Sequence, residues 1–233
     1  MFIFLDTETT GTGDEDRFCQ LAYKTDNGTI AVNELFDPGR SIEIEAMCVH
    51  HITDEMVAGK PSFRGSSTEK ELKELLSNSE NFLVAHNASF DVGMLNREGL
   101  YPKNVICTLK LVRHLDQGGY HKKHNLQYLR YSMKLKIEGA TAHDAFGDVL
   151  VLEALFQRLF QKMMSQNEGD EQKTIQKMIE ISSKPSLLPK ITFGKHKDML
   201  FKDVPKDYLQ WLSGQDDLNE DFKYTVNYYL NSN

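Results

Sequence analysis

The chain has 233 residues, of which 40% are hydrophobic and 26% charged, and its formal net charge is −7. This composition is typical of a globular protein that buries a substantial core, and it excludes disordered and fibrous proteins. The three cysteines are widely spaced and form no CxxC pair, which predicts a reducing compartment. The first apolar run is too short for a membrane span or a signal peptide, so we expect a cytoplasmic protein with no membrane partner.

Charge is distributed unevenly along the chain. Residues 1–60 contain 12 acidic and 4 basic residues, whereas residues 103–136 contain 8 basic residues and 1 acidic residue. An acidic region beside a basic stripe is compatible with a polyanion held next to a metal site. A solvated charged surface explains the same clustering, and charge alone favours this second explanation.

The first 36 residues predict three consecutive antiparallel strands. Met1–Thr7 is a short apolar segment that runs into a loop containing glycine. Phe18–Lys24 and Thr29–Phe36 flank Asp26-Asn27-Gly28, which is a strong hairpin signal. The chain then predicts two further strands, at Asn81–Ala85 and Val105–Thr108, and four helices, at Glu69–Leu76, Phe90–Glu98, Asn125–Tyr131 and His143–Gln161. This order of elements predicts an α/β domain that ends near residue 163.

The composition changes after residue 163. Met164–Gln172 is polar and lacks periodicity, so it is interpreted as a linker. Beyond it we expect a helix at Lys173–Ser182, a small hairpin of Ile191–Gly194 with Met199–Val204, and short helices at Tyr208–Leu212 and Phe222–Leu230. The expected regions are therefore a main domain (1–163), a linker and helix (164–189) and a small α+β accessory region (190–233).

Two acidic residues lie at the end of the first predicted strand. Asp6 and Glu8 occupy positions i and i+2, so a strand projects both carboxylates to the same face. Two such carboxylates repel each other unless a cation lies between them, and hard oxygen ligands suit Mg²⁺ or Mn²⁺. The alternative to a metal site is a pair of exposed acids at a strand-to-loop turn. Asp6 and Glu8 alone do not decide between these two explanations.

Further candidate residues lie where two predicted helices begin. Asp91 follows a buried strand, where α/β sheets place their ligands, although a helix-capping role explains it too. His143 and Asp148 open the long helix, and a neutral histidine, whose ordinary pKa is about 6.5, can deprotonate water at physiological pH. Four carboxylates and one histidine supply what a two-metal phosphodiesterase needs, because two divalent ions clamp the attacking and leaving oxygens.

Three segments resemble the exonuclease motifs of the DEDDh 3′→5′ exonucleases. They are Asp6–Gly11 (DTETTG), His86–Asp91 (HNASFD) and His143–Asp148 (HDAFGD), and their order and spacing match over most of residues 1–160. Lys184–Leu187 and Tyr208–Leu212 also resemble the C-terminal region of the bacterial exonuclease X branch. The resemblance implies a ribonuclease H-like fold, with helices on both faces of a mixed sheet that opens with three antiparallel strands.

The resemblance also implies the roles of individual residues. Two metal ions would be held by Asp6, Glu8, Asp91 and Asp148, with Asp6 shared between the ions. His143 would be the general base, acting with Asp6 and Glu8 in catalysis. The pocket for the 3′-terminal nucleotide would be lined by Thr9, Thr10, His50 and Phe90.

These observations predict a metal-dependent 3′→5′ exodeoxyribonuclease that releases 5′-mononucleotides from DNA, in repair or recombination. The expected partner is a DNA 3′ end, in a single strand or a duplex. An RNA 3′-exonuclease of the ribonuclease T kind stays open, because nothing in the sequence senses a 2′-hydroxyl. A non-enzymatic or polymerase-associated nucleic-acid-binding module also stays open, although a pure binding protein has no need of four converging carboxylates. The sequence contains no pattern that identifies a protein partner.

Overall fold

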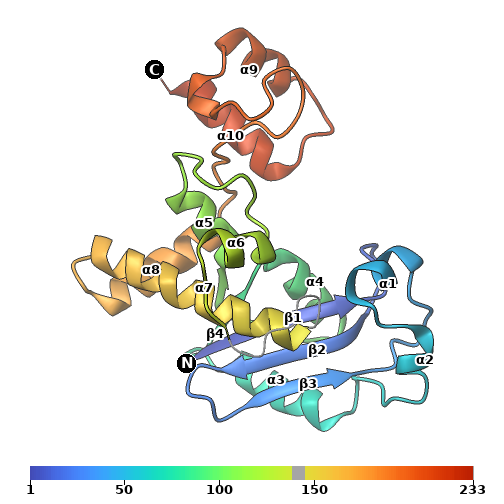
Figure 1. The fold of residues 1–233 in the computed structure, drawn as a ribbon. Coiled ribbons are helices and arrows are strands. Elements are labelled where there is room, and N and C mark those ends of the chain that lie inside the picture. Colours follow the sequence, from blue (N-terminus) through green and yellow to red (C-terminus); the bar gives the residue numbers. More distant parts are fainter. Residues whose placement is uncertain (138–144, 233) are drawn as a thin grey trace.

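The computed structural model describes residues 1–137 and 145–232. At its centre is a mixed sheet with the strand order β3-β2-β1-β4-β5 (Figure 1). β1 pairs antiparallel with β2, and β2 with β3, whereas β1–β4 and β4–β5 are parallel pairs. The strands are β1 (Phe2–Thr9), β2 (Phe18–Thr25), β3 (Ala31–Leu35), β4 (Phe82–Ala85) and β5 (Val105–Cys107). The predicted α/β fold class and its antiparallel opening are confirmed.

The helices of the described chain include three that the sequence analysis did not predict. They are α1 (Ile44–His50), α2 (Asp54–Val57) and α5 (Thr108–Leu115). α5 begins directly after β5, so no loop signal separates the two elements, and α1 and α2 lack a side-chain N-cap. The remaining helices are α3 (Ser67–Ser77), α4 (Ser89–Arg97), α6 (Leu126–Ser132), α7 (Ala145–Gln166), α8 (Glu171–Ser182), α9 (Lys206–Ser213) and α10 (Glu220–Asn231).

The sheet is covered on both faces, and β1 supplies alternate residues to the two cores. Phe4 packs into a cluster with the apolar side of α7, including Phe156. Ile3 and Leu5 pack on the opposite face, in a cluster that contains Leu72 of α3 and residues of α4. Because side chains along a strand alternate between its faces, Asp6 and Glu8 continue the row of Phe4 on the α7 side, and Thr7 continues the other row.

The segment interpreted as a linker is mostly helical, which corrects that prediction. α7 continues to Gln166, and its last turns stay packed because Met163 is buried. α8 begins at Glu171, where the Asp170 side chain caps it by accepting a hydrogen bond from the Lys173 backbone N–H. α8 packs against β5 and α5, and so belongs to the body of the main domain rather than to a connector.

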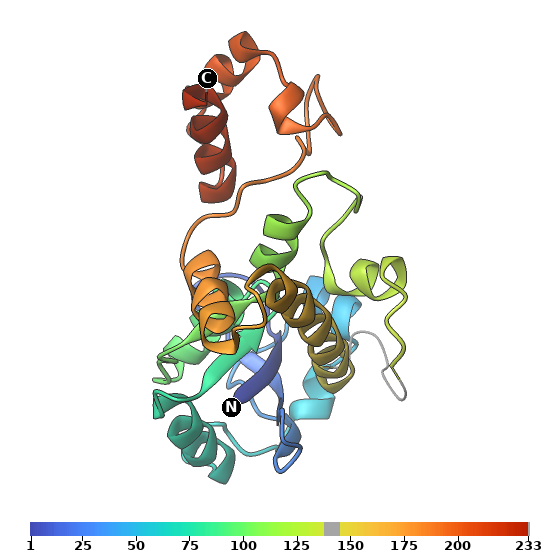
Figure 2. The same ribbon diagram turned by 90° about the vertical axis from the view of Figure 1, so that its left-hand side faces the viewer.

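The C-terminal region stands off one end of the sheet and contains its own apolar cluster (Figures 1 and 2). Its predicted hairpin is reduced to a single bridge, Lys190 to Leu200, followed by a short 3₁₀ helix, η1 (Phe201–Asp203). Pro189 has no N–H to extend the ladder, so the pairing is confined to a few backbone hydrogen bonds, such as those from the Ile191 N–H to the Met199 carbonyl and from the Phe201 N–H to the Pro189 carbonyl, each at 3.0 Å. Among the described residues, no helix is both long and apolar enough to cross a lipid bilayer.

Candidate active site

Three carboxylates meet where β1 ends and α7 begins. Asp6, Glu8 and Asp148 each place one carboxylate oxygen within 4.8 Å of the others, and all three are half-buried. Asp6 and Glu8 arrive there through the alternation of β1, and Asp148 lies in the first turn of α7, which packs on the same face. The structure thus brings together three of the four predicted metal-binding carboxylates from positions about 140 residues apart in the sequence.

Neighbouring elements fix the position of Asp148. Gln127 of α6 donates a hydrogen bond from its Nε2 to Asp148 Oδ1, and the Oε1 of the same amide is buried without a hydrogen-bond partner in the described chain. The backbone N–H of Ala145, the first residue of α7, donates to Oε1 of Gln20 on β2 at 3.4 Å. The start of α7 is therefore held by side chains from both the sheet and α6.

Asp91, the fourth predicted carboxylate, lies outside this group of three. It sits in the first turn of α4, is only 3% exposed, and accepts a hydrogen bond of 2.9 Å from the Thr7 hydroxyl. Burial disfavours the charged carboxylate and raises the pKa of Asp91 to about 7, although the Thr7 hydroxyl acts in the opposite direction. The strand alternation explains this placement, because Thr7 faces the α4 side of the sheet while its two acidic neighbours face α7.

Two of the residues predicted to line the nucleotide pocket are tied into the protein itself. The Thr10 hydroxyl is fully buried and donates to Asp16 Oδ1 at 2.7 Å. The Nδ1 of His50 accepts from the Ile52 N–H, which leaves Nε2 to donate to the Thr9 carbonyl at 3.0 Å. Burial keeps the pKa of His50 below its ordinary value. Both side chains hold the chain that leaves β1.

Thr9 and Phe90, the other two residues predicted to line the pocket, are both at least partly buried. Thr9 is buried, and its hydroxyl donates to the Gly11 carbonyl at 2.8 Å, within its own turn. Phe90 is half-buried against the α3–α4 core cluster, one residue before Asp91, so part of its ring is accessible. His143, the predicted general base, lies outside the described residues.

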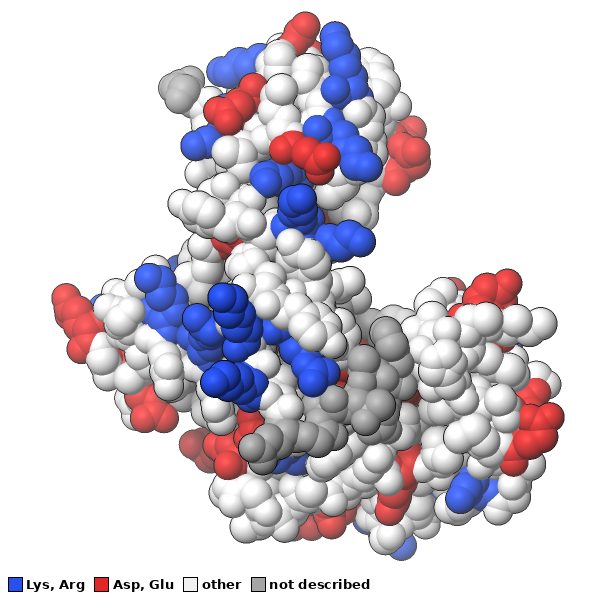
Figure 3. All heavy atoms as spheres, in the orientation of Figure 1, with Lys and Arg blue, Asp and Glu red and all other residues white. Residues whose placement is uncertain are grey.

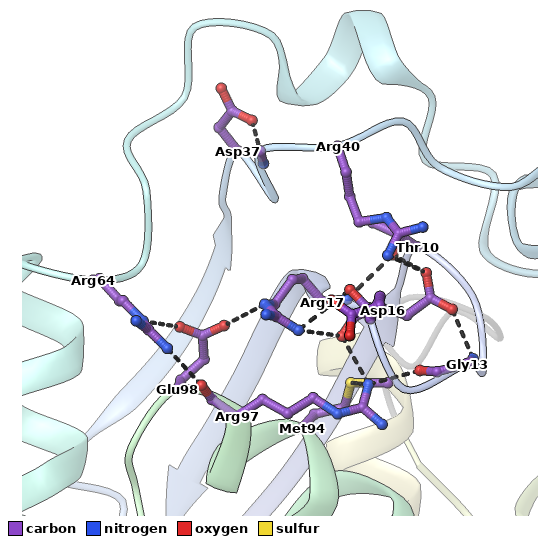
Figure 4. A network of polar contacts seen from close by, with 12 residues as sticks. Thr10, Gly13, Asp16, Arg17, Asp37, Arg40, Arg64, Met94, Arg97 and Glu98 are labelled. Carbon is purple, nitrogen blue, oxygen red and sulfur yellow. Dashed lines mark hydrogen bonds and ion pairs between the residues drawn. The ribbon is translucent and has the colours of Figure 1, made fainter.

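The loop that follows β1 is anchored by a buried acid and an arginine (Figure 4). Asp16 accepts from the Thr10 hydroxyl and from the Gly13 N–H, each at 2.7 Å. Arg97, at the end of α4, donates through Nη1 to the carbonyls of Gly13 and Asp16 at 2.9 and 2.7 Å. A Cβ on Gly11 would lie 2.5 Å from Glu43 Oε2 and 2.6 Å from Asp16 Oδ2, so a larger residue would have to displace both of these side chains.

Sequence reasoning missed three residues that support the site: Thr7, Gln20 and Gln127. Thr7 lies inside the first motif, and strand alternation was the signal that could have directed its hydroxyl toward α4. No local pattern marks Gln20 or Gln127, because each acts on α7 from a distant element.

The donor set suits a divalent cation. Three carboxylate oxygens held within 4.8 Å of one another repel unless a positive charge lies among them, and oxygen-only ligands match the preference of Mg²⁺ and Mn²⁺. Their partial exposure allows a hydrated ion to approach. The residues present therefore fit a hard divalent metal.

Comparisons with known proteins agree with this arrangement. A family model described as Exonuclease matches residues 3–156. The chain is 31% identical to "Exodeoxyribonuclease 10" of Escherichia coli over 242 residues, which cover 99% of each chain. It is 37% identical over 129 residues to "DNA polymerase III subunit epsilon" of Buchnera aphidicola, a match that covers 51% of this chain and 52% of that one.

Solved structures show the same fold. One described as Exonuclease X in complex with 5′ overhanging duplex DNA is 29% identical, has a TM-score of 0.57, and covers 78% of this chain and 99% of its own. An Escherichia coli Exonuclease I complex with a dA16 oligonucleotide has a TM-score of 0.53 at 18% identity, covering 70% of this chain and 43% of its own, and supports the fold alone. The family match, the near full-length relative and the acidic group at the end of β1 together show that this chain belongs to the exonuclease family.

Proposed function

We propose that this chain is a divalent-metal-dependent 3′→5′ exonuclease that releases 5′-mononucleotides from DNA. The observation that carries the proposal is the convergence of Asp6, Glu8 and Asp148 at the end of β1 in a member of the exonuclease family. DNA is favoured over RNA because the relatives at 31% and 29% identity are an exodeoxyribonuclease and an exonuclease bound to duplex DNA.

Each carboxylate has a proposed part in holding the metal. Asp6, Glu8 and Asp148 would hold a first Mg²⁺ or Mn²⁺. Asp91 is proposed for a second ion on the resemblance of the second motif alone. When bound, two such ions neutralise the charge that develops on the phosphodiester and make an attacking water more acidic. The chain's own contribution is a preorganised set of donors, because Gln127 orients Asp148 and Thr7 orients Asp91 through hydrogen bonds.

His143 is proposed as the general base. A neutral imidazole would take one proton from water while the water oxygen bonds to the terminal phosphorus and the bond from phosphorus to the 3′-oxygen breaks. The leaving 3′-oxygen takes a proton from solvent and becomes the 3′-hydroxyl of the shortened strand, and the phosphate leaves on the released nucleotide. This assignment rests on the histidine in the third motif, two residues before α7 begins.

The pocket for the 3′-terminal nucleotide is proposed beside Phe90. Phe90 is partly buried and immediately precedes Asp91, and the exposed part of its side chain would offer an apolar contact for a base or a sugar. Thr9 and His50 would contribute indirectly, since the hydrogen bond between the His50 ring and the Thr9 carbonyl joins α1 to the end of β1. The pocket wall would therefore keep its shape when the nucleotide leaves.

The first test is a nuclease assay on 5′-labelled oligonucleotides. Single-stranded DNA, duplex DNA and RNA are compared with Mg²⁺, with Mn²⁺ and with EDTA. We expect a ladder that shortens from the 3′ end, requires metal and favours DNA. Asp6→Asn, which keeps the shape of the side chain but removes its charge, should lower kcat by roughly 1,000-fold or more, because charge stabilisation at the phosphodiester is lost.

Asp26→Asn is the matched control, since Asp26 is an exposed acid in the turn between β2 and β3, beside the first residue of β1 rather than its last. It should cleave like the wild type. Cleavage of RNA in preference to DNA would replace the proposed substrate. Undiminished cleavage by Asp6→Asn would reject the proposed metal site, and a folded wild-type protein that cleaves no strand would indicate a binding module.

A further inference from the structure

A hollow lies apart from the carboxylates, between the end of α5, the α5–α6 connection, the end of α6 and the second half of α7. Its volume is about 460 Å³, within the range of small-ligand sites. Its lining combines apolar side chains such as Leu159 with four basic ones: His121, Lys134, Arg158 and Lys162. An apolar floor with a cationic rim is the environment that accepts a phosphate ester of a nucleic acid.

Lysine and arginine outnumber carboxylates three to one in the lining of this hollow. No ion pair in the described part of the chain joins Lys134, Arg158 or Lys162 to a carboxylate. Asp116 also lines the hollow, but its oxygens already accept hydrogen bonds from two backbone N–H groups and from His124 Nε2. Figure 3 shows the corresponding concentration of Lys and Arg on the face over α6 and α7.

One of these cations is held in a conformation that costs free energy. Lys134 has a φ of +54°, in the left-handed region that glycine or asparagine usually occupies after a helix. It follows the end of α6, where the Leu135 N–H donates back to the Arg130 carbonyl at 2.9 Å. Glycine would relieve this strain but would remove a positive charge from the rim. This left-handed residue ends α6 and fixes where the chain carrying Lys134 leaves the helix.

The position of the hollow along α7 relates it to the metal site. Arg158 and Lys162 follow Asp148 on the same helix, by about 15 and 21 Å at roughly 1.5 Å per residue. Along a nucleic-acid strand with a rise of about 3.4 Å per nucleotide, these distances correspond to about four to six nucleotides. A strand whose 3′ end lies at the carboxylates is long enough to reach the hollow.

We propose that His121, Lys134, Arg158 and Lys162 bind backbone phosphates of the DNA substrate about four to six nucleotides from the end being cleaved. The inference rests on the proposed exonuclease function and adds a second contact that favours longer strands. The site is electrostatic, so it holds the backbone without reading its sequence. It should act on substrate binding and leave the chemical step unchanged.

The test compares strands that can and cannot reach the hollow. The double variant Lys134→Gln/Arg158→Gln is matched by Lys70→Gln/Lys73→Gln, which removes two exposed charges from α3. On a 15-nucleotide strand we expect KM to rise roughly 5- to 30-fold in the first variant only, with kcat unchanged. On a trinucleotide the three proteins should be equal. The slope of log KM against log salt should fall by about 1.4 to 1.8 for two lost contacts.

A position scan sharpens the same test. Single neutral methylphosphonate linkages are placed at each position of the 15-mer, and the wild-type KM should rise when the linkage lies about four to six nucleotides from the 3′ end. The double variant should be insensitive there. A melting curve of each variant confirms folding, and Lys162→Gln gives an independent, smaller effect if the double variant fails to fold.

The outcomes separate this inference from the proposed function. Equal KM values for both double variants, or a scan with no sensitive position beyond the first two linkages, would overturn the inference while leaving the exonuclease intact. If the wild type cleaves nothing, the proposed function fails, and the Kd of the labelled 15-mer then decides the inference. A Kd that both double variants weaken equally would reject it.

Discussion

The identity of single side chains on β1 decides which partners each face of the strand meets. Asp6 and Glu8 face α7 and meet Asp148, whereas Thr7 faces α4 and donates to Asp91 at 2.9 Å. Moving the strand register by one residue would exchange these faces and separate the acids from α7. The β1–β2 register is disturbed between Glu8 and Thr9, so the regular alternation ends directly after the second acid.

Asp16 shows how one residue couples the site to stability. The Thr10 hydroxyl holds the pKa of Asp16 below its ordinary value of 3.8, helped by the Gly13 N–H and by Arg40 and Arg97, and opposed by burial. Because the folded-state pKa is lowered, the stabilisation is complete above pH 3.8 and is lost as the pH falls through the folded-state pKa. Acid therefore weakens this loop.

We predict that Asp16→Asn lowers the free energy of unfolding by about 1–3 kcal/mol at pH 7. The difference from the wild type should shrink as the pH falls from about 4 to 2, since the wild-type carboxylate then takes up a proton. Urea titrations at a series of pH values measure it. Asp14→Asn changes an exposed acid of the same loop and should have little effect at any pH. A difference that stays constant with pH would contradict this account of Asp16.

A second residue-scale prediction concerns the proposed base. If His143 must be neutral to accept a proton, kcat/KM should rise with pH through the pKa of the imidazole and level off above it. Single-turnover rates with saturating Mg²⁺ between pH 5 and 8 measure this profile. The His143→Ala variant should cleave DNA slowly, and its kcat/KM should no longer rise with pH. A flat wild-type profile would exclude His143 as the base.

At the scale of elements, the loop after β1 depends on α4. Arg97 donates to the carbonyls of Gly13 and Asp16, so this helix holds the chain that leaves the acidic strand (Figure 4). Arg64, also drawn there, pairs with Glu98, which in turn pairs with Arg17 of the loop, and Arg64 also donates to the Arg97 carbonyl. Arg97 therefore binds the loop backbone directly, whereas Arg64 reaches the loop only through Glu98.

We predict that Arg97→Met, which keeps an apolar stem and helix propensity, destabilises the protein by about 1–3 kcal/mol and makes residues 11–17 more sensitive to protease. KM for DNA should rise because the loop beside the carboxylates loosens. Arg64→Met should change stability by less than about 1 kcal/mol, since Arg64 is largely exposed. Equal protease sensitivity in the two variants would show that Arg97 does not anchor the loop.

At the scale of the whole molecule, we propose that the C-terminal region is an accessory unit on an independently stable exonuclease domain. The clusters on both faces of the sheet are built from residues before 182, and the C-terminal cluster begins at Leu188. The two parts meet through polar contacts such as Arg113 with Asp221 at 2.5 Å. The solved exonuclease X chain, 99% of which is matched, covers only 78% of this chain.

A chain that ends at Lys184 should therefore fold and cleave DNA within about threefold of the full-length rate. Its α8 must be kept, because Ser182 Oγ accepts from the Cys107 N–H at 2.8 Å and the helix packs on β5. Circular dichroism melting and the nuclease assay measure both properties. If the chain that ends at Lys184 is unfolded or inactive, the C-terminal region is part of the folding unit. A shorter chain that also lacks α8 provides the destabilised reference for the melting curves.

Local patterns in the sequence determined the strands of the sheet, most of its helices, the acidic pair on one face of β1, and the family. Alternation, hairpin turns and motif spacing are set by residues close together in the chain, so they can be recognised without a structure. The motif resemblance also implied that Asp148 would join Asp6 and Glu8. The tertiary structure alone decided that Asp91 is buried beside Thr7 and that Thr10 turns inward.

Only the packing shows which of several neighbouring apolar residues are buried and which are exposed. Leu209 and Leu212 are buried in the C-terminal region, but Trp211 between them is 56% exposed. Gln20 and Gln127 reach α7 from β2 and α6, and the basic rim joins the α5–α6 connection to α7. These contacts depend on how helices pack over the sheet, a property of the whole chain that short-range patterns do not contain.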